Sequence, residues 1–255
     1  MRGHYQVSNA RDDRVFTAFS WHPGGNVDRR TNLYYLETRD MGRTWQTAAG
    51  QTVQIPLGDD DVHGAALAHD FQAEGRLVYV NDIQLDADGH PVVVMVTSTD
   101  HRPGPYGNPR SFTVVRWDGQ AWQVHEIAPT TNNYDMGSLY VESDGALRFI
   151  GPSEPGPQRW GTGGEVAAWT SQDRGRTWTK TRDVTHDSPR NHSYVRRPVD
   201  AAEGFYAMWA DGNWYTYTRS YLYFTNRRGD RVWRLPYTMD QDHASPELME
   251  CWSDP

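Results

Sequence analysis

The stretches 38–45 (TRDMGRTW) and 171–178 (SQDRGRTW) decide the fold, because they are two copies of one octapeptide. Both follow the pattern Ser/Thr-x-Asp-x-Gly-x-Thr-Trp. Each residue type has a place in a tight turn: the aspartate accepts hydrogen bonds from turn amides, the glycine takes a positive φ, and the tryptophan packs beneath the turn. Two copies of so specific a turn indicate an internal repeat. The alternative is an ordinary hairpin turn that happens to occur twice.

Weaker copies of the turn lie between and after these two. The stretch 117–122 (WDGQAW) is a shortened version, and 225–233 (TNRRGDRVW) keeps the threonine and the glycine but lacks the aspartate. The closing tryptophans stand at positions 45, 122, 178 and 233, a spacing typical of propeller blades. The turn resembles the Asp box, which joins the two outer strands of a blade in sialidases and related propellers. Because such aspartates are structural, Asp40 and Asp173 are not candidates for a functional site.

Each interval between these turns divides into four strand-like segments, which are rich in Val, Tyr, Phe and Trp and are bounded by Gly, Asp or Pro. We therefore predict an all-β fold, a β-propeller with four-stranded antiparallel blades. The predicted strands are 4–8, 14–20, 33–38 and 52–55; 77–85, 91–97, 112–117 and 122–127; 137–142, 147–151, 165–171 and 178–184; and 193–199, 205–210, 221–226 and 232–235. The only candidate helix is 61–69.

These strands form one propeller domain over residues 1–255. The predicted blades span roughly 1–58, 59–130, 131–188 and 189–240, and 241–255 form a C-terminal tail. Propellers commonly have four to eight blades. Because the first residues already read as a strand, we expect the chain to be the C-terminal part of a larger, seven-bladed ring. The alternative is a complete ring of four blades.

The net charge and the cysteine content exclude several classes of ligand and of structure. A net charge of −8 argues against nonspecific binding to nucleic acid or to an anionic membrane, and no partner protein is implied. The single cysteine, Cys251, excludes an internal disulfide, and no apolar run is long enough to span a membrane. The first residues show no basic segment followed by an apolar one, as a leader would.

The cofactor is unknown. A structural or catalytic divalent metal, Ca²⁺ or Zn²⁺, would need ligands from several blades, because no His-x-x-x-His or cysteine pair is present.

The blade register nominates a candidate site. In a propeller, the loops that enter the innermost strands and those that leave the second strands lie on one face and converge on the central axis. Histidine, tyrosine, acidic residues and arginine recur in these loops, whereas generic loop tips are richer in serine, glycine and lysine. The catalytic candidates are His4, His22, Tyr134, His192 and Arg196, and the substrate-binding candidates are Tyr5, Asp82, Asp135, Glu154, Glu165, Arg197 and Trp209.

Each candidate has a chemical role and a structural alternative. His4 and His22 could act as acid, base or metal ligand, or could be hydrogen-bonded structural histidines. Tyr134 needs a neighbouring cation to act as a base, and is otherwise an aromatic packed at a blade seam. Strand alternation places Arg196 and Arg197 on opposite faces, so one could line the axis and clamp a substrate carboxylate. Otherwise each is an arginine in a salt bridge between blades.

Four stretches together resemble the BNR repeat-containing family of secreted bacterial propellers: 32–40 (NLYYLETRD), 133–140 (NYDMGSLY), 161–165 (GTGGE) and 191–198 (NHSYVRRP). The resemblance runs from His4 to about Glu247. It implies that several further blades precede this chain and that the protein is secreted or periplasmic. The family includes or lies near ulvan lyases, seven-bladed propellers that cleave uronate-containing polysaccharides. In such lyases histidines, a tyrosine and an arginine line the funnel.

The resemblance predicts a carbohydrate-active propeller, a polysaccharide lyase that acts on a polysaccharide or oligosaccharide by β-elimination. This reaction requires a neutralised carboxylate, a base for the α-proton and a proton for the leaving oxygen. We assign the first role to Arg196 or Arg197. Tyr134 is the base or acid, and His4 or His22 is its partner.

Two other functions stay open at this point. A sialidase-like glycoside hydrolase would combine Tyr134 with Glu154 or Glu165, although three arginines at suitable blade positions are not visible. A noncatalytic carbohydrate-binding propeller would instead stack sugars on exposed tryptophans. The candidates for such stacking are Trp21, Trp160 and Trp209.

Overall fold

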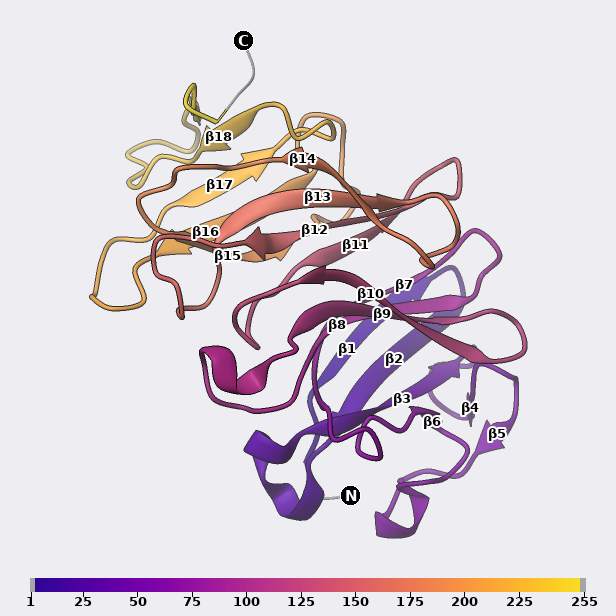
Figure 1. The fold of residues 1–255 in the computed structure, drawn as a ribbon. Coiled ribbons are helices and arrows are strands. Elements are labelled where there is room, and N and C mark those ends of the chain that lie inside the picture. Colours follow the sequence, from indigo (N-terminus) through magenta and orange to yellow (C-terminus); the bar gives the residue numbers. More distant parts are fainter. Residues whose placement is uncertain (1–2, 253–255) are drawn as a thin grey trace.

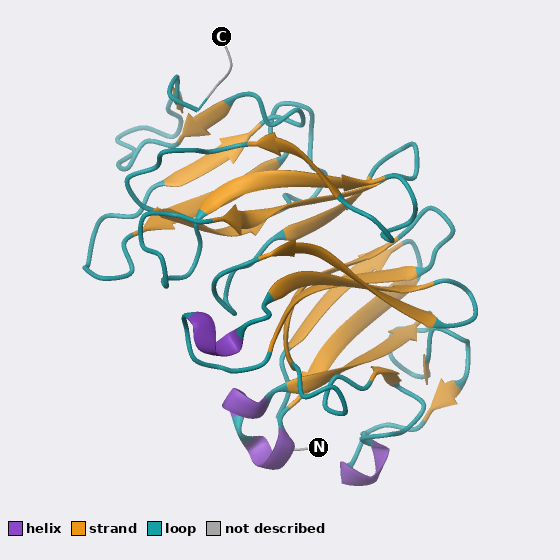
Figure 2. Cartoon of the chain, viewed as in Figure 1, coloured by secondary structure: helices purple, strands orange, loops and turns teal. Residues whose placement is uncertain are grey.

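The computed structural model describes residues 3–252, which form four antiparallel sheets that follow one another in chain order (Figure 1). The all-β propeller architecture predicted from the sequence is confirmed. Within these residues, helix occurs only as single 3-10 turns (Figure 2). These are η1 (Pro23–Gly25), η2 (Val27–Arg29), η3 (Asp59–Asp61) and η4 (Pro105–Gly107). Among the described residues, no helix has the length and apolar character needed to cross a membrane.

The first two sheets each have their innermost strand first in the chain. The first sheet has the order β1-β2-β3-β4-β5, with β6 paired to β3, and the second has the order β7-β8-β9-β10. Their strands are β1 (Gln6–Arg11), β2 (Arg14–Trp21), β3 (Thr31–Thr38), β4 (Trp45–Gln46), β5 (Thr52–Val53), β6 (Leu67–His69), β7 (Leu77–Leu85), β8 (Pro91–Ser98), β9 (Ser111–Trp117) and β10 (Trp122–Pro129).

The third and fourth sheets repeat this meander. Their orders are β11-β12-β13-β14 and β15-β16-β17-β18-β19. The strands are β11 (Ser138–Val141), β12 (Leu147–Glu154), β13 (Glu165–Ser171), β14 (Thr179–Asp183), β15 (Asn191–Arg196), β16 (Ala207–Gly212), β17 (Leu222–Thr225), β18 (Val232–Arg234) and β19 (Glu247–Leu248). β19 and the buried side chain of Trp252 attach part of the segment 241–255 to the fourth sheet.

The helix expected at 61–69 is wrong. A single 3-10 turn ends at Asp61, and Leu67–His69 form β6. β6 pairs with β3, Leu33 opposite His69 and Tyr34 opposite Leu67, so it extends the first sheet. Pairing with β3, at positions that β4 does not reach, outweighs the weak helical preference of a short segment.

The two octapeptides form the same turn in different blades. The first joins β3 to β4, and the second joins β13 to β14. In the second turn, Asp173 accepts hydrogen bonds from Ser171 Oγ (2.8 Å), the Thr177 amide (2.9 Å) and Thr177 Oγ1 (2.6 Å). Asp40 makes the equivalent set in the first turn. Burial opposes ionisation of Asp173, but the hydrogen bonds from Thr177 and Ser171 prevail and lower its pKa to about 2.

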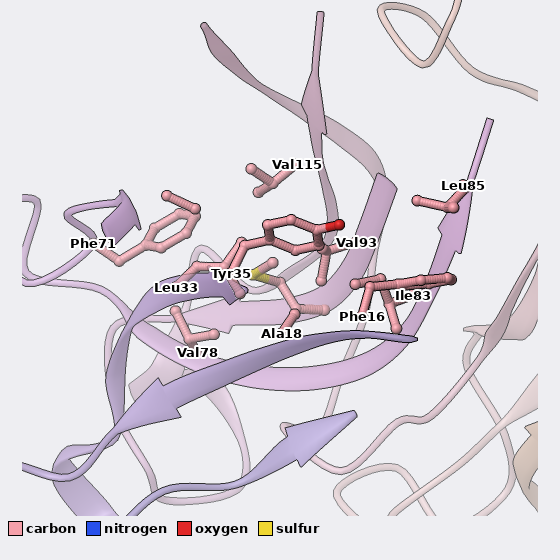
Figure 3. Close-up of a cluster of buried hydrophobic side chains, with 12 residues drawn as sticks. Phe16, Ala18, Leu33, Tyr35, Phe71, Val78, Ile83, Leu85, Val93 and Val115 are labelled. Atoms are coloured by element: carbon pink, nitrogen blue, oxygen red, sulfur yellow. The ribbon is translucent and has the colours of Figure 1, made fainter. Parts of the chain in front are cut away.

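Successive sheets pack face to face, which buries β3 and β8 along their whole length. Figure 3 shows the cluster between the first and second sheets, where Phe16 and Leu33 meet Val78, Ile83 and Val93. The innermost strand β7 contacts both β1 and β11, so neighbouring blades also meet at the axis. This packing holds the loops that connect second to third strands on one common side, seen at the lower left of Figure 1.

The repeated turn gives a stability prediction. Replacing Asp173 with alanine removes the acceptor of three hydrogen bonds and should lower the free energy of unfolding by about 1–2 kcal/mol in urea denaturation. The matched control is Asp183→Ala, which removes only an ion pair between Lys180 and a mostly exposed aspartate and should cost less than about 0.5 kcal/mol. Equal losses in the two variants would contradict a structural role for this turn.

Candidate functional site

The candidate site centres on Arg30, a residue that the sequence analysis did not select. Arg30 follows η2 at the start of β3 and is only 5% exposed. Its Nε donates to the carbonyl of Val27 at 2.7 Å. Its own carbonyl accepts a hydrogen bond of 3.1 Å from the Val78 amide, which fastens this loop to β7 of the second blade. The guanidinium is therefore held at the seam between two blades.

Three tyrosines surround this guanidinium. The carbon Cζ of Arg30 lies 4.7 Å from the ring centre of Tyr5, 4.4 Å from that of Tyr79 and 5.5 Å from that of Tyr134. Nη2 of Arg30 also donates to the hydroxyl oxygen of Tyr134 at 3.1 Å. The negative ring faces offset part of the cost of burying the cation. Burial raises the pKa of Tyr79 to about 12, so this ring serves as a neutral wall.

Tyr134 connects this buried cage to solvent, because 40% of its surface is exposed. Its amide donates to Oδ1 of Asn132 at 3.0 Å, and its ring meets Tyr79 edge to face at 5.4 Å. Because Arg30 occupies one acceptor position of the hydroxyl, the proton of that hydroxyl is free to point at another acceptor. The loop between β10 and β11 therefore presents an oriented phenol at the surface.

Two histidines that the sequence suggested as catalytic residues, His4 and His22, lie near Tyr5. The ring of His22 is buried, 5.0 Å from the ring of Tyr5, and its Nε2 has no hydrogen-bond partner among residues 3–252. Burial, followed by the charges of Arg30 and His4, lowers the pKa of His22, which keeps this imidazole neutral. His4 is exposed and hydrogen-bonds Gln6 at 3.3 Å. The structure thus brings His4, His22 and Tyr5 into one neighbourhood with Tyr134, linked through Arg30.

Arg196 approaches the same neighbourhood from the innermost strand of the fourth blade. Its Nη1 donates to the carbonyl of Asn81 at 3.3 Å, two residues beyond Tyr79 on β7. Asn81 in turn accepts a hydrogen bond of 3.2 Å from the amide of Gly137, three residues beyond Tyr134. The irregular segment before Arg196 holds Tyr194 at a φ of 58°, a left-handed conformation that costs free energy in a tyrosine.

His192 and Trp209 lie in the core of the fourth blade. Trp209 Nε1 donates to Nδ1 of His192 at 2.9 Å, and Nε2 of His192 lies 2.9 Å from Ser188 Oγ. Burial lowers the pKa of His192 to about 3. Neither side chain presents a surface to a sugar, so the expected catalytic histidine and stacking tryptophan are core residues here. The apolar surroundings supplied by Tyr223 and Trp252 explain why.

The two glutamates proposed for substrate contact lie in the third blade. Glu165 is buried and accepts hydrogen bonds from Thr185 Oγ1 (2.6 Å) and from the amide and hydroxyl of Ser188 (both 2.7 Å). Glu154 stands opposite Glu165 in the β12–β13 register and forms an ion pair with Lys180 at 3.1 Å. Within the described residues, neither glutamate contacts Tyr134. Three hydrogen bonds within the blade thus already use acceptor positions of Glu165.

The remaining candidates also support the backbone. Asp135 is fully buried and accepts from Thr130 Oγ1 (2.5 Å) and the Gly163 amide (2.6 Å), and Asp82 accepts from the Leu139 amide (2.9 Å). Arg197 lines a hollow of about 510 Å³ with Tyr140. That hollow lies at the ends of the innermost strands, whereas the Arg30 site lies near their beginnings. Arg196 and Arg197 therefore serve different faces.

One cluster of potential metal ligands occurs among the described residues: Asp86, Asp88 and His90 in the β7–β8 turn. Arg116 binds the carboxylate of Asp86 at 2.6 Å, and Arg174 lies 3.4 Å from that of Asp88. Two guanidinium groups already neutralise this cluster, and turn amides use Asp86 as an acceptor. These three residues therefore do not fit a divalent cation.

The sheets and their converging loops define a β-propeller protein. The model of the BNR repeat-containing family matches residues 4–130, so this part of the chain is similar to that family. No curated protein matches the sequence.

Solved structures give the same fold. An ulvan lyase of polysaccharide lyase family PL25, solved with bound -[GlcA(1-4)Rha3S]-, is similar with a TM-score of 0.70 and 15% identity over 88% of this chain and 51% of that one. The polysaccharide lyase Uly1 is similar with a TM-score of 0.58 and 13% identity over 88% of this chain and 45% of that one. The chain thus spans about half the length of these lyases.

Signals for two missed residues were present in the sequence. Arg30 and Tyr79 stand beside the loops that were searched, one at the start of a third strand and one on an innermost strand. The candidates predicted in these two regions were His22, early in the loop that ends at Arg30, and Asp82, three residues beyond Tyr79 on β7. The contact between Arg30 and Tyr79, across 49 positions of sequence, depends on how the first two blades pack.

The neutral, buried state of His192 gives a pH prediction. Its pKa is lower in the folded protein than in the unfolded chain, so the unfolded state binds more protons and stability falls as pH drops below 6.5. We compare the free energy of unfolding of the unsubstituted protein with that of His192→Gln. As the pH is lowered from 6.5 to about 4.5, the unsubstituted protein should lose stability relative to the variant. The slope of this difference should approach 1.4 kcal/mol per pH unit. Chemical denaturation across this range measures the difference, and a difference independent of pH would show that His192 is not buried in its neutral form.

Proposed function

We propose that the protein is a carbohydrate-active propeller, and more specifically a polysaccharide lyase that cleaves a uronate-containing polysaccharide by β-elimination at the Arg30–Tyr134 site. The observation that carries the proposal is the hydrogen bond of 3.1 Å from the buried guanidinium of Arg30 to the exposed hydroxyl of Tyr134. It orients a phenol proton at the propeller face where the loops of several blades meet. The fold shared with ulvan lyases supports this choice of substrate class.

The chain's own residues can divide the reaction between them. Arg196, which is half-buried near the axis, neutralises the uronate carboxylate and so favours loss of the neighbouring proton. An imidazole, that of His4 or His22, takes that proton while the electron pair forms the new double bond. The bond to the leaving oxygen breaks, and the hydroxyl of Tyr134 protonates that oxygen. Arg30 is a positioning residue, because it acts through Tyr134.

The hydrolase alternative lacks its main requirement at this site. Hydrolysis of this kind uses two carboxyl groups that flank the scissile bond. The candidate Glu165 is instead occupied by Thr185 and Ser188. A noncatalytic carbohydrate-binding propeller stays the second candidate, because the loop between β16 and β17 exposes three aromatic side chains. Under either proposal the protein acts outside the cytoplasm, secreted or periplasmic, where such polysaccharides occur.

Lyase activity can be tested with ulvan and other uronans, by following the absorbance of newly formed unsaturated ends. Tyr134→Phe keeps the ring but removes the hydroxyl, and should reduce the initial rate by about 10²-fold or more. Tyr106→Phe is the control, because Tyr106 is an exposed tyrosine in a neighbouring loop and makes no contact with Arg30. An absence of product on every uronan, or full activity in Tyr134→Phe, would contradict the proposed reaction.

A further inference from the structure

The loop 213–221 between β16 and β17 exposes three aromatic side chains within four residues. The exposed fractions are 55% for Trp214, 61% for Tyr215 and 103% for Tyr217. Large aromatic groups left in water forgo the free energy that burial would give. Neighbouring exposed aromatics therefore mark a surface that binds something.

The base of this loop is fixed by the buried carboxylate of Asp211. It accepts a hydrogen bond of 2.7 Å from the Tyr221 amide and one of 3.0 Å from the hydroxyl of Tyr223. Arg190 binds the same carboxylate at 2.9 Å and also donates to the carbonyl of Arg219. A loop anchored in this way presents its aromatic rings at a defined place, which lowers the entropic cost of binding a ligand.

Direct contacts connect this loop to the Arg30 site. Trp214 packs closely against Gly161. A Cβ atom added to this glycine would lie only 2.4 Å from the Cβ atom of Trp214 and would clash with it. The next residue back, Trp160, covers Gly104 beside η4, and its carbonyl accepts a hydrogen bond of 3.1 Å from Asn132. Asn132 also holds the amide of Tyr134. In Figure 1 the loops that carry these residues lie along the same lower-left side of the molecule.

Positive charge accompanies the aromatic rings along this path, although the chain as a whole is acidic. The guanidinium of Arg159 lies 4.6 Å from the ring centre of Trp160, and that of Arg219 lies 4.6 Å from that of Tyr237. Neither arginine forms an ion pair with any residue in the described range. Exposed guanidinium groups beside flat aromatic faces suit a ligand that has both apolar ring faces and negative charges.

We propose that Trp214, Tyr215 and Tyr217, together with Trp160 and Arg159, form a distal binding track for an extended anionic polysaccharide. Its sugar rings stack on the aromatic side chains, and its carboxylate or sulfate groups bind Arg159 and also Arg219, which lies in the same loop as Tyr217. This inference rests on the proposed function, since it places the reacting part of the same chain at Tyr134. A chain that reaches from Tyr134 to Trp214 occupies loops of three successive blades, whereas a disaccharide occupies the Arg30 site alone.

The test compares long and short ligands in a variant that lacks the track. Trp214→Ala/Tyr215→Ala/Tyr217→Ala should bind ulvan polymer about tenfold more weakly, measured by titration calorimetry, while its affinity for the ulvan disaccharide stays unchanged. Phe205→Ala is the matched control, because Phe205 is an exposed aromatic near the opposite end of β16. Thermal unfolding of each variant verifies that the fold is intact.

The outcomes separate this inference from the lyase proposal. Loss of polymer affinity without any formation of unsaturated ends would remove the lyase reaction and keep the track. Normal cleavage of polymer by the triple variant with unchanged affinity would overturn the track and keep the lyase. A change in oligomeric state on light scattering, with ulvan affinity intact, would show that the aromatic loop binds a second copy of the chain and would also overturn the track. Equal affinity for a neutral polymer such as starch would contradict the role of the arginines.

Discussion

Face-to-face packing of successive antiparallel sheets is the constraint on which the other features of this molecule depend. Each sheet must bury apolar side chains on both faces, and β3 and β8 are buried from end to end as a result. Once the first two sheets pack through Phe16, Leu33 and Ile83, the start of β3 must lie beside β7. The loops that connect second to third strands must then lie on the same side of the molecule. Residues from different blades therefore converge on one face. The site is a consequence of this packing.

The buried cation at the seam is the main electrostatic feature of that face. Arg30 forms no ion pair with a carboxylate in residues 3–252; three aromatic rings, a carbonyl and a phenol hydroxyl surround it instead. Burial of a charge without a counterion is costly, so the arrangement persists only because the blades fix it. Because the groups around this guanidinium are neutral, its positive electrostatic potential extends to the exposed side of the site. An anionic ligand that arrives near Tyr134 meets that potential.

The repeated turns and the strand pattern could be predicted because they depend on local chemistry. A short hydrogen-bonded turn around Asp173 and alternating β-branched or aromatic residues specify strands whatever lies beyond them. The surroundings of the predicted site residues depend instead on contacts between distant parts of the chain, which the sequence does not specify locally. The structure places Tyr134 and Tyr5 around Arg30 and His22 beside Tyr5, and loop position brings these three predicted site residues to one face. The sequence missed Arg30, and it selected His192, although apolar neighbours from β16, β17 and the C-terminal segment enclose that imidazole. Which histidine becomes a core residue is decided by packing partners that sequence position does not reveal.

We have proposed that a uronate-containing sugar binds at the Arg30–Tyr134 face. A crystal structure of the protein with a uronate oligosaccharide tests this proposal most directly. We expect a sugar bound at the loop face, with an oxygen of the ligand within hydrogen-bond distance of the Tyr134 hydroxyl and a carboxylate near Arg196. A sugar bound in the hollow beside Arg197 and Tyr140, at the opposite ends of the innermost strands, with the Tyr134 face empty, would contradict it.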